Sequence, residues 1–192
     1  MSDNVNRMSK EEIRCLYLKR RENVLEQDKQ ELARKFYDNF FNNVTISEGS
    51  VVSGFFPIKG EIDIIPVMKE LKKRGYICVM PRMIDKNTPL EFIEWYDGIE
   101  MTVDNYNIPV PVGGKKYIPD VVLTTFLVFD ENRDRIGYGA GMYDRTIADI
   151  KEKNRPVFMI GVGYEFQKID SIPTLDTDIV MDMVVTDENV YI

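Results

Sequence analysis

The chain contains no histidine among its 192 residues. Without an imidazole, Ser-His-Asp catalysis, histidine-ligated zinc and imidazole acid–base chemistry are excluded. Cysteine is nearly absent as well. Cys15 and Cys78 are too few for a disulfide framework and lack metal-ligand spacing, so we expect both to be reduced and structural. Chemistry must therefore come from carboxylates, Lys, Arg, Tyr or a metal bound with the substrate.

The sequence also lacks an excess of positive charge and any long apolar run. Its 32 acidic and 25 basic residues give a net charge of −7. That balance disfavours non-specific binding to nucleic acids or anionic membranes, which depends on a positive field. The first ten residues have no apolar core of the kind that signal peptides contain. We expect a cytoplasmic protein without nucleic-acid or membrane partners.

Helix-like and strand-like segments alternate along the chain. Ser9 and Glu12 form a capping box that marks the first helix, from about Lys10. Its expected inward stripe is Ile13, Leu16, Tyr17, Arg20 and Val24. Further helices are predicted around 32–43, over 61–74 and after residue 141. Strands are predicted at 50–56, 76–80, 90–96, 121–129, 157–162 and 180–185.

This alternation predicts an α/β fold. Strands joined by right-handed helical crossovers form a mostly parallel open sheet with helices on both faces, which is a Rossmann-like three-layer arrangement. Pro81 is expected to stop the strand before it, and the turn-rich stretch 97–119 is expected to be irregular. The length suits a single domain over 1–192, with residues 1–8 as a flexible N-terminus.

The most informative segment is 135–145, RIGYGAGMYDR. Its glycines alternate along the chain: Gly137, Gly139 and Gly141. Glycines let backbone N–H groups approach an anion closely, and the N-terminus of the following helix adds a favourable dipole. Arg135 and Arg145 supply cations, and Asp144 supplies a hard oxygen ligand where Mg²⁺ could bridge phosphates. The segment predicts a phosphate-binding loop, although alternate glycines in an arbitrary sequence are more often ordinary turn residues.

Other motifs occur before and after this loop. They are Lys10, Ile13 and Arg14 as KxxxR; Glu61 after a strand; Pro81-Arg82; IPxP at 108–111; Phe129-Asp130 at a strand end; and IPxxxxD at 172–178. Their identity and order, from about Lys10 to Asp187, resemble the 5-formyltetrahydrofolate cyclo-ligase family, also called 5,10-methenyltetrahydrofolate synthetases. The signature of that family is an apolar strand ending in FD, a turn, and RLGxGxGYYDR.

The resemblance implies ATP- and Mg²⁺-dependent closure of 5-formyltetrahydrofolate to 5,10-methenyltetrahydrofolate, with release of ADP and phosphate. In the mechanism proposed for the family, the formyl oxygen attacks the γ-phosphate, the 10-nitrogen closes on the activated carbon, and phosphate leaves. Such a transfer needs positioning and charge neutralisation more than a protein nucleophile, so a chain without histidine can perform it. The expected partner is a reduced folate, and the expected state is a monomer or weak homodimer.

The resemblance also implies site residues. The implied ATP ligands are Lys10, Arg14, Arg135, Ile136, Gly137, Tyr138, Gly139, Ala140, Gly141, Met142 and Tyr143. The implied folate contacts are Phe56, Glu61, Tyr138, Gly139, Ala140, Gly141 and Met142. The implied Mg²⁺ ligands are Asp144 and Asp178, and the implied catalytic residues are Arg135, Tyr143 and Arg145.

Each assignment has a structural alternative. Lys10 and Arg14 lie one turn apart, and basic pairs of this kind are usually solvated helix faces. Asp144 could compensate a helix dipole, Asp178 could cap a turn, and Glu61 could be a first-turn acid. A further set of aromatic residues could stack on folate, although buried aromatics more often belong to the core. This set is Trp95, Tyr96 and Tyr106.

Several positions depart from the family pattern. Ala140 replaces a glycine or lysine, Met142 the first of two tyrosines, and Thr177 a histidine, while a Pro-Gly pair is missing at 124–126. These changes motivate a rival hypothesis of a protein that binds folate or nucleotide with little catalysis. A sugar-phosphate isomerase or acyl transferase on a related scaffold is a second rival. The two distant aspartates and the basic pair on the first helix favour the cyclo-ligase.

Overall fold

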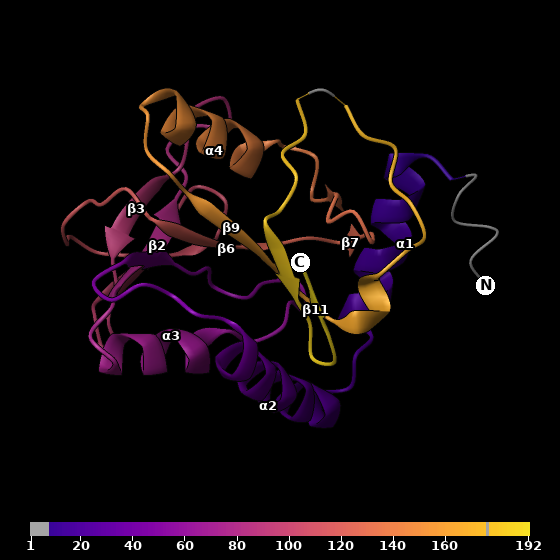
Figure 1. Cartoon of the computed structure of the whole chain (residues 1–192), viewed down its shortest axis with the longest axis horizontal. Helices are drawn as coiled ribbons and strands as arrows, with labels where there is room; N and C mark the ends of the chain where they lie inside the picture. The colour runs from indigo at the N-terminus through magenta and orange to yellow at the C-terminus, as the bar shows by residue number, and fades with distance from the viewer. Residues whose placement is uncertain (1–7, 176) are drawn as a thin grey trace.

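A seven-stranded sheet forms the centre of the molecule (Figure 1), and the computed structural model describes residues 8–175 and 177–192. The strand order is β11-β10-β9-β6-β1-β2-β3. The strands are β1 (Val51–Ser53), β2 (Ile77–Arg82), β3 (Glu91–Glu94), β6 (Val121–Thr125), β9 (Phe158–Val162), β10 (Met183–Val185) and β11 (Val190–Tyr191). The five inner strands are parallel, and the outer strands β3 and β11 are antiparallel to their neighbours. The predicted mostly parallel sheet is confirmed.

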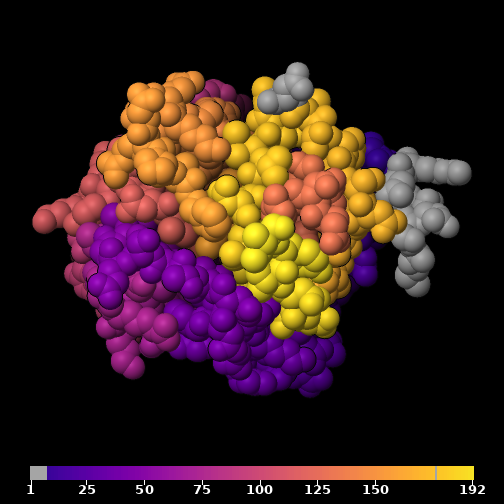
Figure 2. Space-filling model, viewed as in Figure 1, coloured from indigo at the N-terminus to yellow at the C-terminus, as the bar shows by residue number. Residues whose placement is uncertain are grey.

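Helices cover both faces of this sheet, as predicted. The α-helices are α1 (Lys10–Glu22), α2 (Glu26–Asn43), α3 (Ile65–Lys73) and α4 (Met142–Glu152). In Figure 1, α2 and α3 lie on one face, α4 on the other, and α1 beside β7 at one end. Figure 2 shows the C-terminal residues directly against α2, where the Asn39 amide donates to the carbonyls of Thr186 and Asn189. No helix in the described ranges has the length and apolarity that a bilayer-spanning helix requires.

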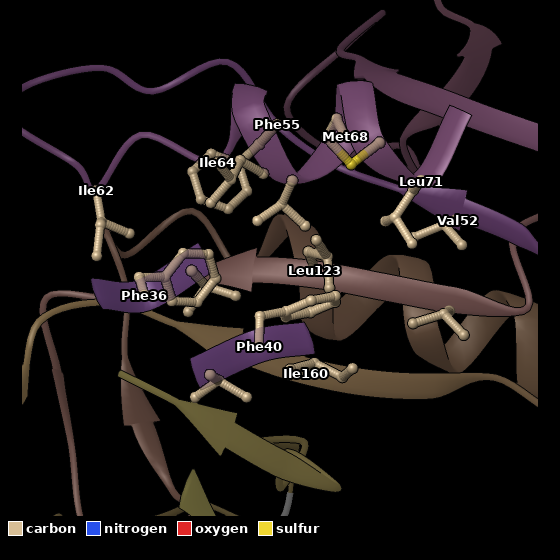
Figure 3. Close-up of a cluster of buried hydrophobic side chains, with 14 of the residues drawn as sticks. Phe36, Phe40, Val52, Phe55, Ile62, Ile64, Met68, Leu71, Leu123 and Ile160 are labelled. Carbon is tan, nitrogen blue, oxygen red and sulfur yellow. The ribbon is translucent and has the colours of Figure 1, made fainter. Parts of the chain in front are cut away.

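The main core lies between α2, α3 and the sheet (Figure 3). Phe36 and Phe40 are one helical turn apart, so both rings project from α2 toward the strands. Each is at most 1% exposed. They pack in one cluster with Met68 of α3 and with Leu123 and Ile160 of the sheet. Burying each ring contributes about 1.5–3 kcal/mol, and this packing fixes the sheet from which the site residues project.

The buried face of α1 differs from the predicted stripe. Ile13, Tyr17 and Arg21 are buried, whereas Leu16 and Arg20 are exposed. The buried residues form a single i, i+4, i+8 row, so α1 contacts the molecule along a narrow line. The predicted stripe placed Arg20 inward, whereas the structure buries the next residue, Arg21. Cys15 is also exposed and therefore has no packing role, whereas Cys78 is buried.

The predicted strand 121–129 is divided into two. β6 ends at Thr125, and β7 (Val128–Phe129) pairs with β8 (Arg135–Ile136) in a separate small sheet. At the break, the Gln167 amide donates to the carbonyls of Phe126 and Leu127. A remote side chain thus replaces the ladder partners of these residues. The chain leaves the main sheet here and carries the glycine loop away from it.

The helix predicted from residue 61 begins at Ile65, with Pro66 in its first turn. Proline is tolerated there because the first N–H groups of a helix have no intrahelical partner. Asp63 accepts a hydrogen bond from the Ile65 N–H and supports the start. The interpretation of Glu61 as a first-turn acid is therefore wrong. Glu61 lies in the preceding loop and is buried.

Two other expectations are corrected. Pro81 does not end its strand, because it lies within β2 and pairs with Phe92 of β3. The residues of β2 that pair with β1 are 77–79, so the missing N–H of Pro81 interrupts no ladder with β1. The stretch 97–119 contains a hairpin of β4 (Met101–Val103) and β5 (Pro109–Pro111). The predicted flexible segment 1–8 lies outside the described residues, apart from Met8, which packs against the α1 cluster.

Candidate active site

The glycine loop connects β8 to α4. Gly139 has φ +95° and Gly141 has φ +61°, in the region that favours glycine. A Cβ on Gly139 would also lie 3.2 Å from Cζ of Arg14. Gly139 is thus required both by its backbone and by a neighbouring guanidinium. Gly137 differs, because a Cβ there would meet nothing within 4 Å in the structure.

The loop ends at the N-terminus of α4. Gly141 is its N-cap and provides no side-chain cap. The first backbone bond runs from the Arg145 N–H to the Gly141 carbonyl. Among the described residues, no acceptor faces the N–H groups of Met142, Tyr143 or Asp144. Unpaired N–H groups and the helix dipole together favour an anion at this position.

Two cations of α1 contact the site, Arg14 at the glycine loop and Lys10 at Asp178. The capping box of Ser9 and Glu12 starts the helix, as predicted. Lys10 Nζ lies 3.1 Å from Asp178 Oδ2. Arg14 Nε donates to the Gly137 carbonyl over 3.0 Å. The prediction that these residues share a helix face is confirmed, but the face is turned toward the glycine loop rather than only toward solvent.

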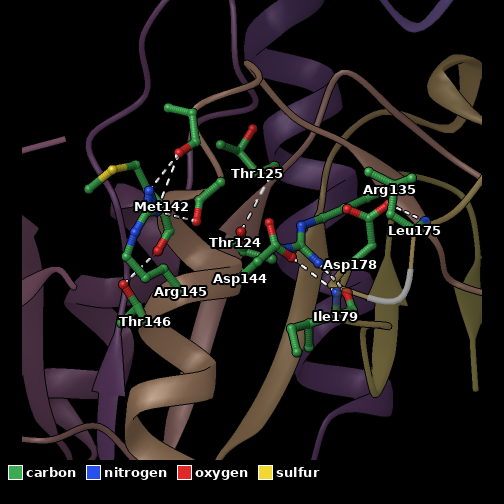
Figure 4. A network of polar contacts seen from close by, with 12 residues as sticks. Thr124, Thr125, Arg135, Met142, Asp144, Arg145, Thr146, Leu175, Asp178 and Ile179 are labelled. Carbon is green, nitrogen blue, oxygen red and sulfur yellow. Dashed lines mark hydrogen bonds and ion pairs between the residues drawn. The ribbon is translucent and has the colours of Figure 1, made fainter. Parts of the chain in front are cut away.

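Asp144 and Asp178 lie in one polar cluster around Arg135 (Figure 4). Asp144 Oδ1 accepts from Arg135 Nη2 over 2.6 Å and from the Ile179 N–H over 3.1 Å. Asp178 Oδ2 accepts from the Leu175 N–H over 2.9 Å. Burial opposes ionisation of Asp178, but the Leu175 N–H and Lys10 outweigh it, so the pKa of this carboxyl is below its ordinary value. Asp144 thus bonds the N–H of Ile179, the residue that follows Asp178, so the fold brings these two distant aspartates close together.

These two carboxylates are suited to a Mg²⁺ ion that substrate phosphates also bind, rather than to a metal held by protein ligands alone. Within the described residues, no three Asp, Glu, Cys or His side chains gather into a metal cluster. Mg²⁺ is commonly held by one or two carboxylates together with substrate phosphates and water. The second oxygens, Asp144 Oδ2 and Asp178 Oδ1, accept no hydrogen bond from the described part of the chain. The donor set is therefore suited to a phosphate-bound Mg²⁺.

The predicted catalytic residues occupy three different environments. Arg135 has a buried side chain that bonds Asp144 and the Ile179 carbonyl. Tyr143 is half-buried against a cluster that includes Phe129 and Ile147, and burial raises the pKa of its hydroxyl. Arg145 is partly exposed, and its guanidinium donates to the carbonyls of Ala140, Gly141 and Lys86.

The predicted folate residue Glu61 is at the other end of the loop. Its Oε1 accepts from the Tyr138 hydroxyl over 2.9 Å, and its Oε2 accepts from the Ile58 N–H over 2.9 Å. Arg21 Nη2 lies 3.7 Å from Oε1. Burial raises the pKa of Glu61, and Arg21 opposes this rise. Sequence reasoning missed Arg21, and the only available signal was its place four residues after Tyr17.

The other predicted folate residue, Phe56, packs edge-on against Trp95, with ring centroids 6.4 Å apart. Trp95 is buried in the main core, whereas Tyr96 and Tyr106 are each 47% exposed. The core interpretation thus holds for Trp95 alone.

A cleft of about 430 Å³ lies between Arg82 and the β4–β5 hairpin.

Comparison with known proteins identifies the family. The model of the 5-formyltetrahydrofolate cyclo-ligase family matches residues 6–187. The chain belongs to this family. The 5-formyltetrahydrofolate cyclo-ligase of Escherichia coli (strain K12) is 26% identical over 181 residues, which are 90% of this chain and 97% of that one. The family and such relatives indicate an enzyme of the cyclo-ligase class.

Solved structures are similar over nearly the whole fold. The 5,10-methenyltetrahydrofolate synthetase of Aquifex aeolicus has 27% identity and a TM-score of 0.81, covering 96% of this chain and 92% of that one. The synthetase of Mycoplasma pneumoniae has 24% identity and a TM-score of 0.76, covering 94% and 100%. At 24% identity, the second likeness shows the fold alone. The two structures together confirm the predicted α/β fold of this chain.

Proposed function

We propose that this cyclo-ligase family member converts 5-formyltetrahydrofolate to 5,10-methenyltetrahydrofolate, with ATP and Mg²⁺, and releases ADP and phosphate. One observation carries the proposal. The glycine loop leads into the uncapped N-terminus of α4, Arg14 of α1 contacts this loop, and Lys10 of α1 pairs with Asp178, which lies in the polar cluster of Arg135 and Asp144. Phosphoryl transfer depends on this kind of positioning and charge neutralisation. We further infer a single-domain, cytoplasmic protein that is monomeric or weakly dimeric.

The loop and α1 would bind the triphosphate. Free N–H groups at the start of α4 face the anion, and Arg14 and Lys10 neutralise its charge from the side. The Arg14 guanidinium already contacts Gly137 and Glu11, so it is held against the loop. Arg145 adds a partly exposed cation at the helix start. This arrangement fixes the γ-phosphorus for attack by the formyl oxygen, which breaks the bond to ADP.

Asp144 and Asp178 would hold Mg²⁺ on the phosphates. The ion would neutralise charge on the phosphate oxygens during transfer. Arg135 acts through Asp144, because its buried guanidinium donates from Nη2 to this carboxylate and thereby fixes it. Its Nη1 donates to the Ile179 carbonyl. Arg135 is therefore proposed as a positioning residue. Tyr143 is proposed to line the site from the first turn of α4.

Glu61 and Phe56 would hold the pterin of the folate. The carboxylate accepts hydrogen bonds from adjacent ring and amino N–H groups, and the phenyl ring packs on the heterocycle. Once the formyl oxygen carries the phosphoryl group, the 10-nitrogen attacks the carbon. The carbon–oxygen bond then breaks, and phosphate leaves with the former formyl oxygen. Product formation thus needs folate and nucleotide on the two sides of one loop.

The test is a direct assay. Purified protein is incubated with 5-formyltetrahydrofolate, ATP and Mg²⁺, and methenyltetrahydrofolate is followed by its near-ultraviolet absorbance. Controls omit ATP or replace Mg²⁺ with EDTA. We expect product that depends on both. Absence of product, with ATP or folate still raising the melting temperature, would instead favour a binding protein, and Ala140 and Met142 would be the positions to restore.

A further inference from the structure

Arg21 is a buried arginine at the end of α1, and its side chain is 1% exposed. Its Nε donates to the Lys59 carbonyl over 3.0 Å, and its Nη1 donates to the Phe126 carbonyl over 3.0 Å. Its Nη2 donates to the hydroxyl of Tyr138. The guanidinium plane is therefore fixed from three sides, by the loop before α3, by the break after β6 and by the glycine loop.

The loop that carries Glu61 is fitted to this arginine. Lys59 and Gly60 have positive φ values of 49° and 73°. A Cβ on Gly60 would lie 2.7 Å from the backbone oxygen of Arg21. The backbone of the loop thus packs directly on α1 at this residue. Arg21 is therefore both the residue on which the Glu61 loop packs and the charged group beside the Glu61 carboxylate.

Arg21 is the nearest cation to the Glu61 carboxylate. Burial of this carboxyl strongly disfavours its charged form, and the arginine is the principal group opposing that effect. The Ile58 N–H and the hydroxyls of Tyr138 and Thr125 also favour the charged form. Other titratable groups that face this region are Lys59, Asp63, Tyr143 and Tyr164.

We propose that Arg21 is a positioning residue for substrate recognition, which keeps Glu61 ionised and aims it at the pterin. The proposal rests on the proposed function, since it takes Glu61 as a folate contact. An ionised carboxylate accepts from two neighbouring N–H groups, whereas a protonated one presents a hydroxyl to a donor. Loss of Arg21 therefore weakens recognition although Arg21 does not touch the substrate.

The main variant is Arg21→Met, which keeps the length of the side chain without its charge. Folate binding is measured by calorimetry between pH 6 and 9. We expect affinity at pH 7.5 to fall by about tenfold, the equivalent of losing one charge-assisted hydrogen bond. The loss should grow toward pH 6, because Glu61 then becomes protonated. Affinity for ATP should change by less than about twofold.

Arg20→Met is the matched control, because it removes the same charge from the next, exposed position of α1. We expect its folate affinity and pH profile to equal those of the unmodified protein. Glu61→Gln should bind folate weakly at every pH. Adding Arg21→Met to Glu61→Gln should produce no further pH dependence, since the group that Arg21 controls is then absent.

A second readout does not depend on folate. The side-chain carboxyl of Glu61 is followed by ¹³C NMR in the ligand-free protein, and its pKa should be higher in Arg21→Met than in the unmodified chain. If Arg21→Met fails to fold, Arg21→Lys replaces it, and it should keep the unmodified pH profile with weaker affinity. An unchanged Glu61 pKa, or folate loss equal at all pH values, would overturn the proposal.

The two proposals fail in different ways. If the unmodified protein binds no folate, the proposed function fails and the recognition role falls with it. The NMR titration then still decides whether Arg21 holds the charge of Glu61. If folate is bound and converted but Arg21→Met behaves like Arg20→Met, the proposed function stands and the role of Arg21 is refuted.

Discussion

The Arg14 guanidinium packs against Gly139 of the glycine loop, and a Cβ at this glycine would lie 3.2 Å from Cζ of Arg14. The same arginine holds the loop through the Gly137 carbonyl. Helix α1 and the glycine loop are thus packed as a single unit. A side chain added at position 139 and a side chain removed at position 14 should therefore damage the same proposed function.

Gly139→Ala should raise the Michaelis constant for ATP and lower stability. The residue must keep φ near +95°, and forcing a non-glycine residue into such a conformation costs about 1–3 kcal/mol. Thermal unfolding and initial rates against ATP concentration measure the two effects. Gly137→Ala is the matched control for stability, because its Cβ would meet nothing within 4 Å. Equal melting temperatures for the two variants would refute the steric argument.

Arg14→Ala should raise the Michaelis constant for ATP more than that for folate. The guanidinium is proposed to contact phosphate, and a lost charge-assisted bond is worth about 1.5–3 kcal/mol, or roughly 10- to 150-fold. Steady-state kinetics with each substrate varied in turn check the prediction. Lys19→Ala on the exposed face of α1 serves as the control. An effect confined to folate would reverse the assignment of Arg14.

Asp144→Asn should abolish Mg²⁺-dependent turnover, and it should also lower stability because it removes the ion pair of the buried Arg135 guanidinium. The substitution removes a hard anionic ligand from the first turn of α4, and an amide oxygen binds Mg²⁺ more weakly. Turnover is measured over a wide range of Mg²⁺ concentrations, with circular dichroism as a check of folding. Asp149→Asn, one turn or more further along the same helix, is the control. Unchanged activity would remove Asp144 from the metal site.

Glu91→Gln should destabilise the protein at neutral pH and matter less in acid. Lys116 and Arg82 hydrogen-bond the Glu91 carboxylate and hold its pKa below the ordinary value. A depressed native pKa gives stability that is present above the unfolded pKa and lost as the pH falls through the native pKa. The difference should be about 0.2–1 kcal/mol at pH 7, as for exposed ion pairs, and it should shrink as the pH falls through the lowered native pKa. Denaturant unfolding at neutral and acidic pH measures it, and a constant difference would contradict it.

The order of elements and the glycine loop could be predicted because they depend on local patterns. Helical spacing placed Phe36 and Phe40 inward, and the capping box located the start of α1. The break after β6 could not be predicted, since it depends on the amide of Gln167. Ile13 and Tyr17 of the buried row of α1 were predicted, but its last member, Arg21, was missed because its partners come from three distant segments.

The site residues follow the same division. Residue types in the loop indicated anion binding, but sequence could not show that Arg135 is committed to Asp144 and Ile179. It also could not show that Tyr138 turns back onto Glu61. Both features depend on contacts with segments distant in the sequence, Ile179 for Arg135 and Glu61 for Tyr138. The roles assigned to the site residues remain predictions for the experiments above.

Helix α1 touches three parts of the site along one rigid rod. Lys10 pairs with Asp178, Arg14 with the glycine loop, and Arg21 with Glu61. The rod is seated by Ile13 and Tyr17 on a small cluster separate from the main core. A displacement of about 1 Å can reduce a rate by about a hundredfold. Substitutions in that seat should therefore resemble active-site lesions in their kinetics, although they remove no group that contacts a substrate.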